Sequence, residues 1–276
     1  MKCQVQKTNS QIMGKEQNNR LLTFEGHLSV LRKTLFRILG VSLIISIIIF
    51  FFKNVTWEIL LAPSEDAFVT YRAIEHVIHL FGIDSFSFEN FEVNLIATDL
   101  ASQFMIHMTT AIYLGLLCAS PYILYELFKF ISPALLENER KYSTYILIVI
   151  YILFLVGLLI SYFIIFPISF RFLGTYQVAD KVNSMISLKS YISTFTSLTI
   201  VMGVIFQLPV IVYILAKKSI LNFKILVKYR KPALFIIVAL SAIITPPDII
   251  TCIVVTLPLY GLYECSIWIA KRVHKR

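Results

Sequence analysis

Six stretches of this chain are long, apolar and free or almost free of charged residues. They are Leu35–Phe52, Phe104–Tyr125, Ser143–Phe170, Ser190–Ala216, Pro232–Thr245 and Ile249–Ala270. A helix of about 20 apolar residues crosses a bilayer core about 30 Å thick. Only 15% of the residues are charged, against about 25% in soluble domains, so a soluble globule of this size would lack the charges to cover its surface. The sequence therefore predicts an all-α polytopic membrane protein with six transmembrane helices.

The fifth stretch is short, with only 14 residues, and the turn Pro246-Pro247-Asp248 separates it from the sixth. Two adjacent prolines cannot continue a helix. The pair is either one re-entrant hairpin or two short spans that thin the bilayer locally at modest cost. We favour short fifth and sixth spans.

Basic residues lie mainly on one side of the predicted membrane. Twenty of the 25 Lys and Arg residues fall in the two tails, the second loop and the fourth loop. Because such residues mark cytoplasmic segments, both termini are expected in the cytoplasm, as an even number of spans requires. The net charge of +9 therefore indicates topology and does not indicate a nucleic-acid partner.

The N-terminal region is polar, and no small-residue cleavage motif follows the first apolar run. The first span is therefore expected to be retained, and the lack of an Arg/Ser-rich transit segment favours a bacterial inner membrane. We expect a polar cytoplasmic tail over 1–26, a single six-span membrane domain over 27–271 and a basic cytoplasmic tail over 272–276.

The first outer loop, roughly residues 53–103, is too long for a simple connector. Six of its apolar residues recur at helical spacing: Ala67, Phe68, Tyr71, Ile74, Ile78 and Phe81. This spacing predicts an external amphipathic helix. The stretch Phe86–Ile96 is more extended in character.

Catalytic and metal-binding motifs are absent from the sequence. It has no HExxH, GxSxG, P-loop or GxGxxG motif, so no enzyme and no cofactor are predicted. The four cysteines show no zinc or disulfide spacing, and we interpret them as buried thiols. His76 and His79 lie three residues apart without further ligands, so no metal site is expected.

Polar groups near the membrane allow two interpretations each. Gln207, two residues before Pro209, either forms an interhelical hydrogen bond or meets a partner helix. Five glutamates lie on the basic side of the chain: Glu25, Glu126, Glu137, Glu139 and Glu264. They either form exposed ion pairs of little energy or accept a basic peptide through charge-assisted arginine pairs.

A series of segments in this order resembles the TatC family, the polytopic subunit of the twin-arginine (Sec-independent) protein translocase. The segments are His27–Arg32 (similar to the family's HLxELR), Ala62-Pro63, Ala97–Ser102, Ser120–Tyr125, Phe130–Leu135 with Glu139 beyond it, Phe166-Pro167, Phe206–Val210, Thr245–Asp248 and Leu262–Glu264. The resemblance runs from about Phe24 to Lys271. No single segment would identify the family, but so many in order are highly specific.

The resemblance implies a receptor that reads twin-arginine signal peptides at the cytoplasmic face and moves folded proteins across the membrane with the proton-motive force. Glu139 matches the principal loop carboxylate, and the family's second carboxylate falls on Val30. The signal-peptide-binding residues expected here are Glu139, Phe130, Pro133, Glu137, Glu126, Glu25 and Arg32.

The resemblance also implies TatA- and TatB-type single-span partners in a multimeric complex surrounded by membrane lipid. Gln207, which stands where the family has a glutamate, and Pro209 are expected to dock such a partner. The remaining motif residues, expected to be structural or functional, are Pro63, Asp99, Pro121, Pro246, Pro247, Asp248 and Glu264. The alternatives are a secondary transporter for a small solute and a structural scaffold, and the lack of a mid-membrane charge speaks against the transporter.

Overall fold

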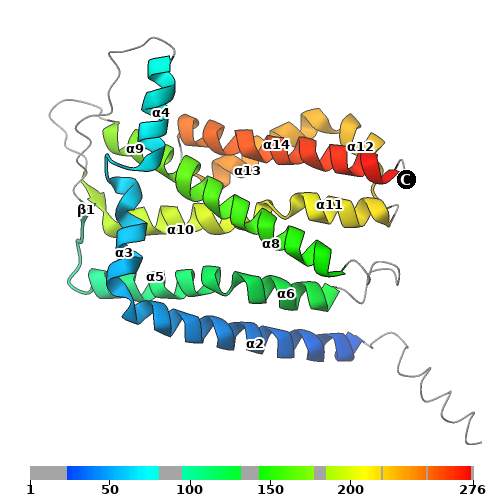
Figure 1. Ribbon diagram of the computed structural model, residues 1–276, viewed down its shortest axis with the longest axis horizontal. Coiled ribbons are helices and arrows are strands. Elements are labelled where there is room, and N and C mark those ends of the chain that lie inside the picture. The colour runs from blue at the N-terminus through cyan, green and yellow to red at the C-terminus, as the bar shows by residue number, and fades with distance from the viewer. Residues whose placement is uncertain are drawn as a thin grey trace, which may run out of the picture.

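The computed structural model describes residues 24–80, 95–131, 143–176, 185–218, 220–246 and 248–274, and these residues are mostly helical (Figure 1). Four helices in this part of the chain are long and apolar enough to cross a membrane, and a fifth span is formed if a bent helix pair is counted as one. The prediction of a helical membrane protein with several spans is therefore confirmed.

The helices lie side by side along the long axis of the molecule, except at one end (Figure 1). Their bounds are α2 (Phe24–Phe51), α3 (Lys53–Leu61), α4 (Val69–Leu80), α5 (Ser102–Cys118), α6 (Ser120–Ile131), α8 (Ser143–Ile160), α9 (Phe166–Thr175), α10 (Leu188–Ile205), α11 (Leu208–Lys217), α12 (Phe223–Lys228), α13 (Arg230–Ile244) and α14 (Ile249–His274). A 3-10 turn, η1 (Ala62–Ser64), follows α3, and a π-helical segment, η3 (Ser161–Ile165), joins α8 to α9.

The core lies where α10 meets η3 and α14. Ile165, Leu198, Met202 and Val255 are completely buried there. In contrast, many large apolar side chains on the outside of the bundle are exposed, such as Ile243. A soluble protein rarely exposes a contiguous apolar surface of this kind, whereas such a surface suits contact with lipid.

Three of the long segments are interrupted beside a proline. The axes of α5 and α6 differ by 55° at the break before Pro121. The π-helical segment η3 precedes Pro167, and the turn between α10 and α11 precedes Pro209. Proline has no N–H to donate to the residue four positions earlier, so a helix commonly kinks or bulges at such a point.

The lengths of the last two apolar segments differ from each other. Helix α13 has 15 residues and is about 22 Å long, which confirms a short fifth segment. Helix α14 has 26 residues and is about 39 Å long, so the predicted short sixth span is wrong. The helix continues beyond Ala270 through Lys271 and Arg272, whose long basic side chains can extend to the membrane surface.

The end of the bundle opposite the start of α2 is covered by α3, η1 and α4 (Figure 1). Helix α4 confirms the helix predicted in the first loop. Phe68, just before the helix, and Tyr71, in its first turn, are buried, whereas Arg72 is exposed. Ala67 is exposed in the turn before α4, and Phe81 lies outside the described residues. A two-stranded parallel sheet, β1 (Leu95–Ile96) with β2 (Ile186–Ser187), is a small addition to the predicted all-α fold.

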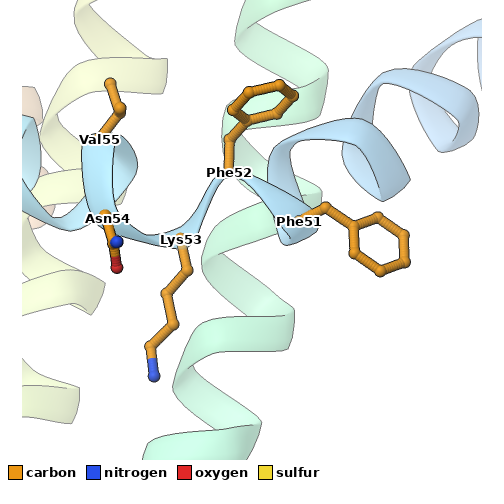
Figure 2. A pocket seen from close by; sticks show the side chains of 5 residues that line it. All are labelled: Phe51, Phe52, Lys53, Asn54 and Val55. Carbon is orange, nitrogen blue, oxygen red and sulfur yellow. The ribbon is translucent and has the colours of Figure 1, made fainter.

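Helix α2 begins and helix α14 ends at the same end of the bundle (Figure 1). At the other end, α2 turns sharply into α3, and Figure 2 shows the five residues at this corner, from Phe51 to Val55. They line a hollow of about 250 Å³. Their side chains point in different directions and converge on no common point (Figure 2), so the corner offers no binding site.

Candidate functional site

Glu126 is a buried carboxylate on α6 with two partners. The Tyr122 hydroxyl, one turn earlier on the same helix, donates a hydrogen bond of 3.2 Å to its Oε1. The Arg37 guanidinium, from α2, lies 3.6 Å from the same oxygen. The Arg37 side chain is 57% exposed, whereas that of Glu126 is 6% exposed. Glu126 is thus a carboxylate already arranged to hold an arginine at the rim of the bundle.

Glu264 on α14 is held in the same way. The Tyr260 hydroxyl donates a 3.1 Å hydrogen bond to Oε1, and Arg230 of α13 donates a 2.7 Å hydrogen bond to Oε2. Both glutamates follow a tyrosine by four residues, a spacing that places the two side chains on one helix face. The sequences Tyr-Ile-Leu-Tyr-Glu and Tyr-Gly-Leu-Tyr-Glu carry this pattern twice. The spacing of tyrosine and glutamate can be recognised in the sequence, but the arginine that pairs with each glutamate cannot.

Other residues of the predicted signal-peptide site are only partly described. Phe130 is half-buried on α6, one helical turn beyond Glu126. Arg32 is exposed on α2, with its guanidinium 5.7 Å from the Phe36 ring centroid. The side chain of Glu25 and the residues Pro133, Glu137 and Glu139 lie outside the described residues. Within the described part, the structure therefore brings together Glu126 and Arg37, which the sequence did not pair.

Gln207 lies in the turn between α10 and α11. Its Nε2 donates to the Ile150 carbonyl of α8 at 3.2 Å and to the Gly203 carbonyl at 3.4 Å. This is the interhelical hydrogen bond that the sequence allowed. Its Oε1 is buried and accepts no hydrogen bond from any described residue. Pro209 is buried two residues further on, where a helix tolerates the missing N–H in its first turn.

Several of the predicted motif residues have structural contacts. The Pro63 carbonyl accepts from the Tyr71 hydroxyl at 2.9 Å. The Asp99 carbonyl accepts from the Ser102 hydroxyl at 2.8 Å, where α5 begins. Asp248 Oδ1 accepts from the Thr251 N–H at 2.6 Å and so caps the start of α14. Asp248 N–H donates to the Pro246 carbonyl at 2.7 Å, while Pro247 lies outside the described residues.

Three tyrosine hydroxyls attach the cap, formed by α3, η1 and α4, to the bundle, and sequence reasoning missed these contacts. The hydroxyls of Tyr162 and Tyr191 each donate 2.7 Å hydrogen bonds, to the Ile59 and Leu60 carbonyls respectively. These carbonyls belong to the last turn of α3, where a helix leaves carbonyls without intrahelical partners. Tyr71 of α4 lies within bonding distance of the Pro63 and Pro167 carbonyls, 2.9 and 3.1 Å away. Burial raises the pKa of Tyr71 far above its usual value, so it stays a donor.

Proline also explains how α4 meets the bundle. Because Pro167 has no N–H, it cannot donate an α-helical hydrogen bond to the Phe163 carbonyl four residues earlier. The hydroxyl of Thr70, beside Tyr71, donates a hydrogen bond to this carbonyl. The cap thus donates a hydrogen bond to a backbone carbonyl at the interruption between α8 and α9.

The described residues include no group of three or more His, Cys, Asp or Glu side chains placed to hold a metal. His107 has a structural role in this part of the chain. Trp57 Nε1, which can only donate, bonds His107 Nδ1 at 3.1 Å. His107 Nε2 therefore carries the proton and donates to the Phe50 carbonyl at 3.1 Å. This histidine links α2, α3 and α5.

The family profile described as "Sec-independent protein translocase protein (TatC)" matches residues 26–258 of the chain. The TatC of Blattabacterium sp. subsp. Periplaneta americana is 36% identical over 265 residues, which cover 95% of this chain and 99% of that protein. TatCy of Bacillus subtilis is 37% identical over 185 residues, which cover 67% of this chain and 73% of that protein.

A solved structure of the same family resembles the fold. A crystal structure titled "Twin Arginine Translocase Receptor- TatC" superposes with a TM-score of 0.70 at 30% identity, over 90% of this chain and 99% of that one. The family profile matches most of the chain, and the sequence relatives and the superposed structure belong to the same family. The chain belongs to the TatC family of Sec-independent protein translocase proteins.

Proposed function

We propose that this chain is the receptor and core subunit of a twin-arginine translocase in a bacterial inner membrane. It binds twin-arginine signal peptides at its cytoplasmic face and, with TatA- or TatB-type single-span partners, moves folded proteins across the membrane with the proton-motive force. The observation that carries the recognition step is Glu126, a buried carboxylate that already forms an ion pair with an arginine. The comparisons give no support to a transporter for small solutes.

The proposed topology has six spans with both termini in the cytoplasm. It counts α5 with α6 as one bent span and α13 as a short span, because α13 is flanked by a basic segment at one end and the Pro246 turn at the other. Twenty of 25 Lys and Arg residues then lie on the cytoplasmic side. Reporter fusions after Thr175 and Pro246 should report an external location, and fusions after Lys218 and His274 a cytoplasmic one. A cytoplasmic reporter at Pro246 would contradict a crossing by α13.

The proposed recognition chemistry uses several carboxylates along α6 and the segment after it. Glu126 lies on α6, and Glu137 and Glu139 follow within 13 residues. A guanidinium can bind a carboxylate through two parallel hydrogen bonds, which lysine cannot reproduce. Near lipid, weaker solvent screening strengthens such pairs. Glu139 is proposed as the principal contact for the signal-peptide arginines, with Phe130 and Pro133 shaping its surroundings.

Site-specific cross-linking tests this assignment. A twin-arginine precursor should cross-link to membranes that contain the unmodified chain, and Glu139→Ala should abolish the cross-link while the protein still inserts. Glu58→Ala, which removes a carboxylate from the cap instead, serves as the matched control. Undiminished cross-linking in the Glu139 variant would contradict the proposal.

The proposed partner surface includes Gln207 and Pro209. The buried Gln207 Oε1 has spare acceptor capacity, but its amide also connects α11 to α8. Gln207→Leu should therefore reduce co-purification of a single-span partner, whereas Gln207→Glu, which restores the family's residue, should retain it. If Gln207→Leu leaves both co-purification and export intact, Gln207 is not part of the docking surface.

A further inference from the structure

A groove of about 1240 Å³ is lined by residues of α8, α11 and α14. The last turns of α14, which contribute to it, lie at the end of the bundle where α2 begins (Figure 1). Its deeper part is apolar, with Leu153 and Val149 on α8, Val210 on α11 and Ile269 on α14. Of the residues given a role above, only Pro209 of the proposed partner surface is among those that line the groove.

The outer end of the groove is basic. Lys217 lies at the end of α11, and Arg272 and His274 lie in the last turns of α14. The Arg272 guanidinium carbon lies 3.8 Å from the Trp268 ring centroid, and a guanidinium over an aromatic face can still donate hydrogen bonds from its N–H edges to an anion. Of the described residues that line the groove, none is acidic. The rim therefore favours a negatively charged group.

The dimensions of the groove fit one leaflet of a bilayer. On α8 it extends over nine residues, from Tyr145 to Leu153, which corresponds to a rise of about 12 Å. Half of a hydrocarbon core of about 30 Å is about 15 Å. A spanning partner helix would need a surface more than twice as long, whereas the acyl chains of one leaflet end near this depth.

We propose that the groove binds an anionic phospholipid. Its acyl chains lie between α8 and α14, and its phosphate lies between Lys217 and Arg272. Basic pockets between transmembrane helices at the cytoplasmic surface have the chemistry to bind acidic headgroups. The inference rests on the proposed function only in naming the leaflet as cytoplasmic.

Native mass spectrometry of the purified full chain in detergent tests this site, with phosphatidylglycerol and phosphatidylcholine as probes. The double variant Lys217→Gln/Arg272→Gln removes the basic rim. Lys224→Gln/Lys231→Gln removes the same charge from exposed positions that do not line the groove and is the matched control. Ala216→Trp fills the groove without changing charge.

The unmodified protein should bind phosphatidylglycerol more tightly than phosphatidylcholine. Each basic side chain beside an acidic headgroup contributes about fivefold in affinity, so the rim variant should bind phosphatidylglycerol about 30-fold more weakly, and the control should match the unmodified protein. Ala216→Trp should reduce binding of both lipids. Equal binding of both lipids by the unmodified protein, or the same loss in the control, would overturn the proposal.

A photo-cross-linking residue in place of Tyr213 tests the same groove in native membranes and does not depend on the rim variants folding. A phospholipid adduct supports the proposal. A single-span protein as the main adduct would assign the groove to a partner helix and overturn the proposal.

Discussion

Arg37 and Glu126 form an ion pair across the contact between α2 and α6, with Nη1 3.6 Å from Oε1. The pair joins a buried acid to an exposed base, and Tyr122 donates a hydrogen bond to the same acid. Arg37 lies seven residues after Val30 on α2, about 10 Å further along the helix. Val30 stands where the resemblance implied a carboxylate, and the Arg37–Glu126 pair lies about two helical turns further along α2.

Removal of Arg37 should destabilise the protein. In Arg37→Ala, Glu126 stays buried and keeps only the Tyr122 hydrogen bond. The 3.6 Å contact is an ion pair and not a hydrogen bond, and the Arg37 side chain is 57% exposed, so the expected loss is about 1 kcal/mol. Thermal unfolding of the purified protein in detergent measures this loss. Lys33→Ala, which removes an exposed charge from the same helix, should change little, and an equal effect in both variants would show that the ion pair contributes nothing.

A carboxylate placed at position 30 should strengthen signal-peptide binding. Val30 is 39% exposed, so a glutamate there could reach a bound peptide. A charge-assisted hydrogen bond to one arginine should improve affinity about tenfold, which corresponds to about 1.4 kcal/mol. Fluorescence anisotropy with a labelled twin-arginine peptide measures the affinity of Val30→Glu. The control is Val30→Gln, which has a similar shape without the charge, and a gain of the same size there would refute an electrostatic cause.

Gly115 should not tolerate a side chain. A Cβ at this position would lie 2.8 Å from Ser46 Cα and closer still to Ser46 Oγ, where α5 crosses α2. Overpacking of this kind typically costs about 1–3 kcal/mol, so Gly115→Ala should lower the unfolding temperature. A Cβ added at Gly40 would meet no atom within 4 Å, and Gly40→Ala should be neutral or stabilising because alanine favours helix. Equal stability of Gly115→Ala and Gly40→Ala would contradict a close approach of α5 to α2 at Gly115.

The cap should depend on the Tyr71 hydroxyl. Tyr71→Phe leaves the buried Pro63 and Pro167 carbonyls without this donor, and an unsatisfied buried acceptor costs about 1–3 kcal/mol. Limited proteolysis and thermal unfolding should both detect the loss. Tyr176→Phe, at an exposed position, is the control. If Tyr71→Phe resists protease as well as the control does, the hydroxyl does not attach the cap.

The same tyrosine predicts a pH dependence. Burial raises the pKa of Tyr71 in the folded state, whereas an unfolded tyrosine titrates near pH 10. The stabilisation is therefore complete below about pH 10 and decreases as the pH rises above that value. The stability advantage of the unmodified protein over Tyr71→Phe should shrink above about pH 10, and an advantage that grew there would contradict a buried, protonated hydroxyl.

The sequence predicted the long helices because all the apolar runs except the fifth are about as long as a bilayer requires, and it predicted α4 from the spacing of Phe68 and Tyr71. The length of α14 was missed because its last turns are basic, and hydropathy alone ends the segment at Ala270. The contacts of Tyr191 with Leu60 and of Arg37 with Glu126 join residues about 90 to 130 positions apart, and no local pattern reports such pairs.

The central claim, that carboxylates of this chain read paired arginines, is tested most directly by one comparison of affinities. The purified full chain is titrated with a twin-arginine signal peptide and with its twin-lysine counterpart, and the titrations are repeated with Glu139→Gln and Glu126→Gln. Because lysine cannot make the two parallel hydrogen bonds of a guanidinium, the unmodified protein should prefer the arginine peptide about tenfold or more. Glu139→Gln should abolish that preference, and Glu126→Gln should reduce it. An unchanged preference in both variants would contradict the account.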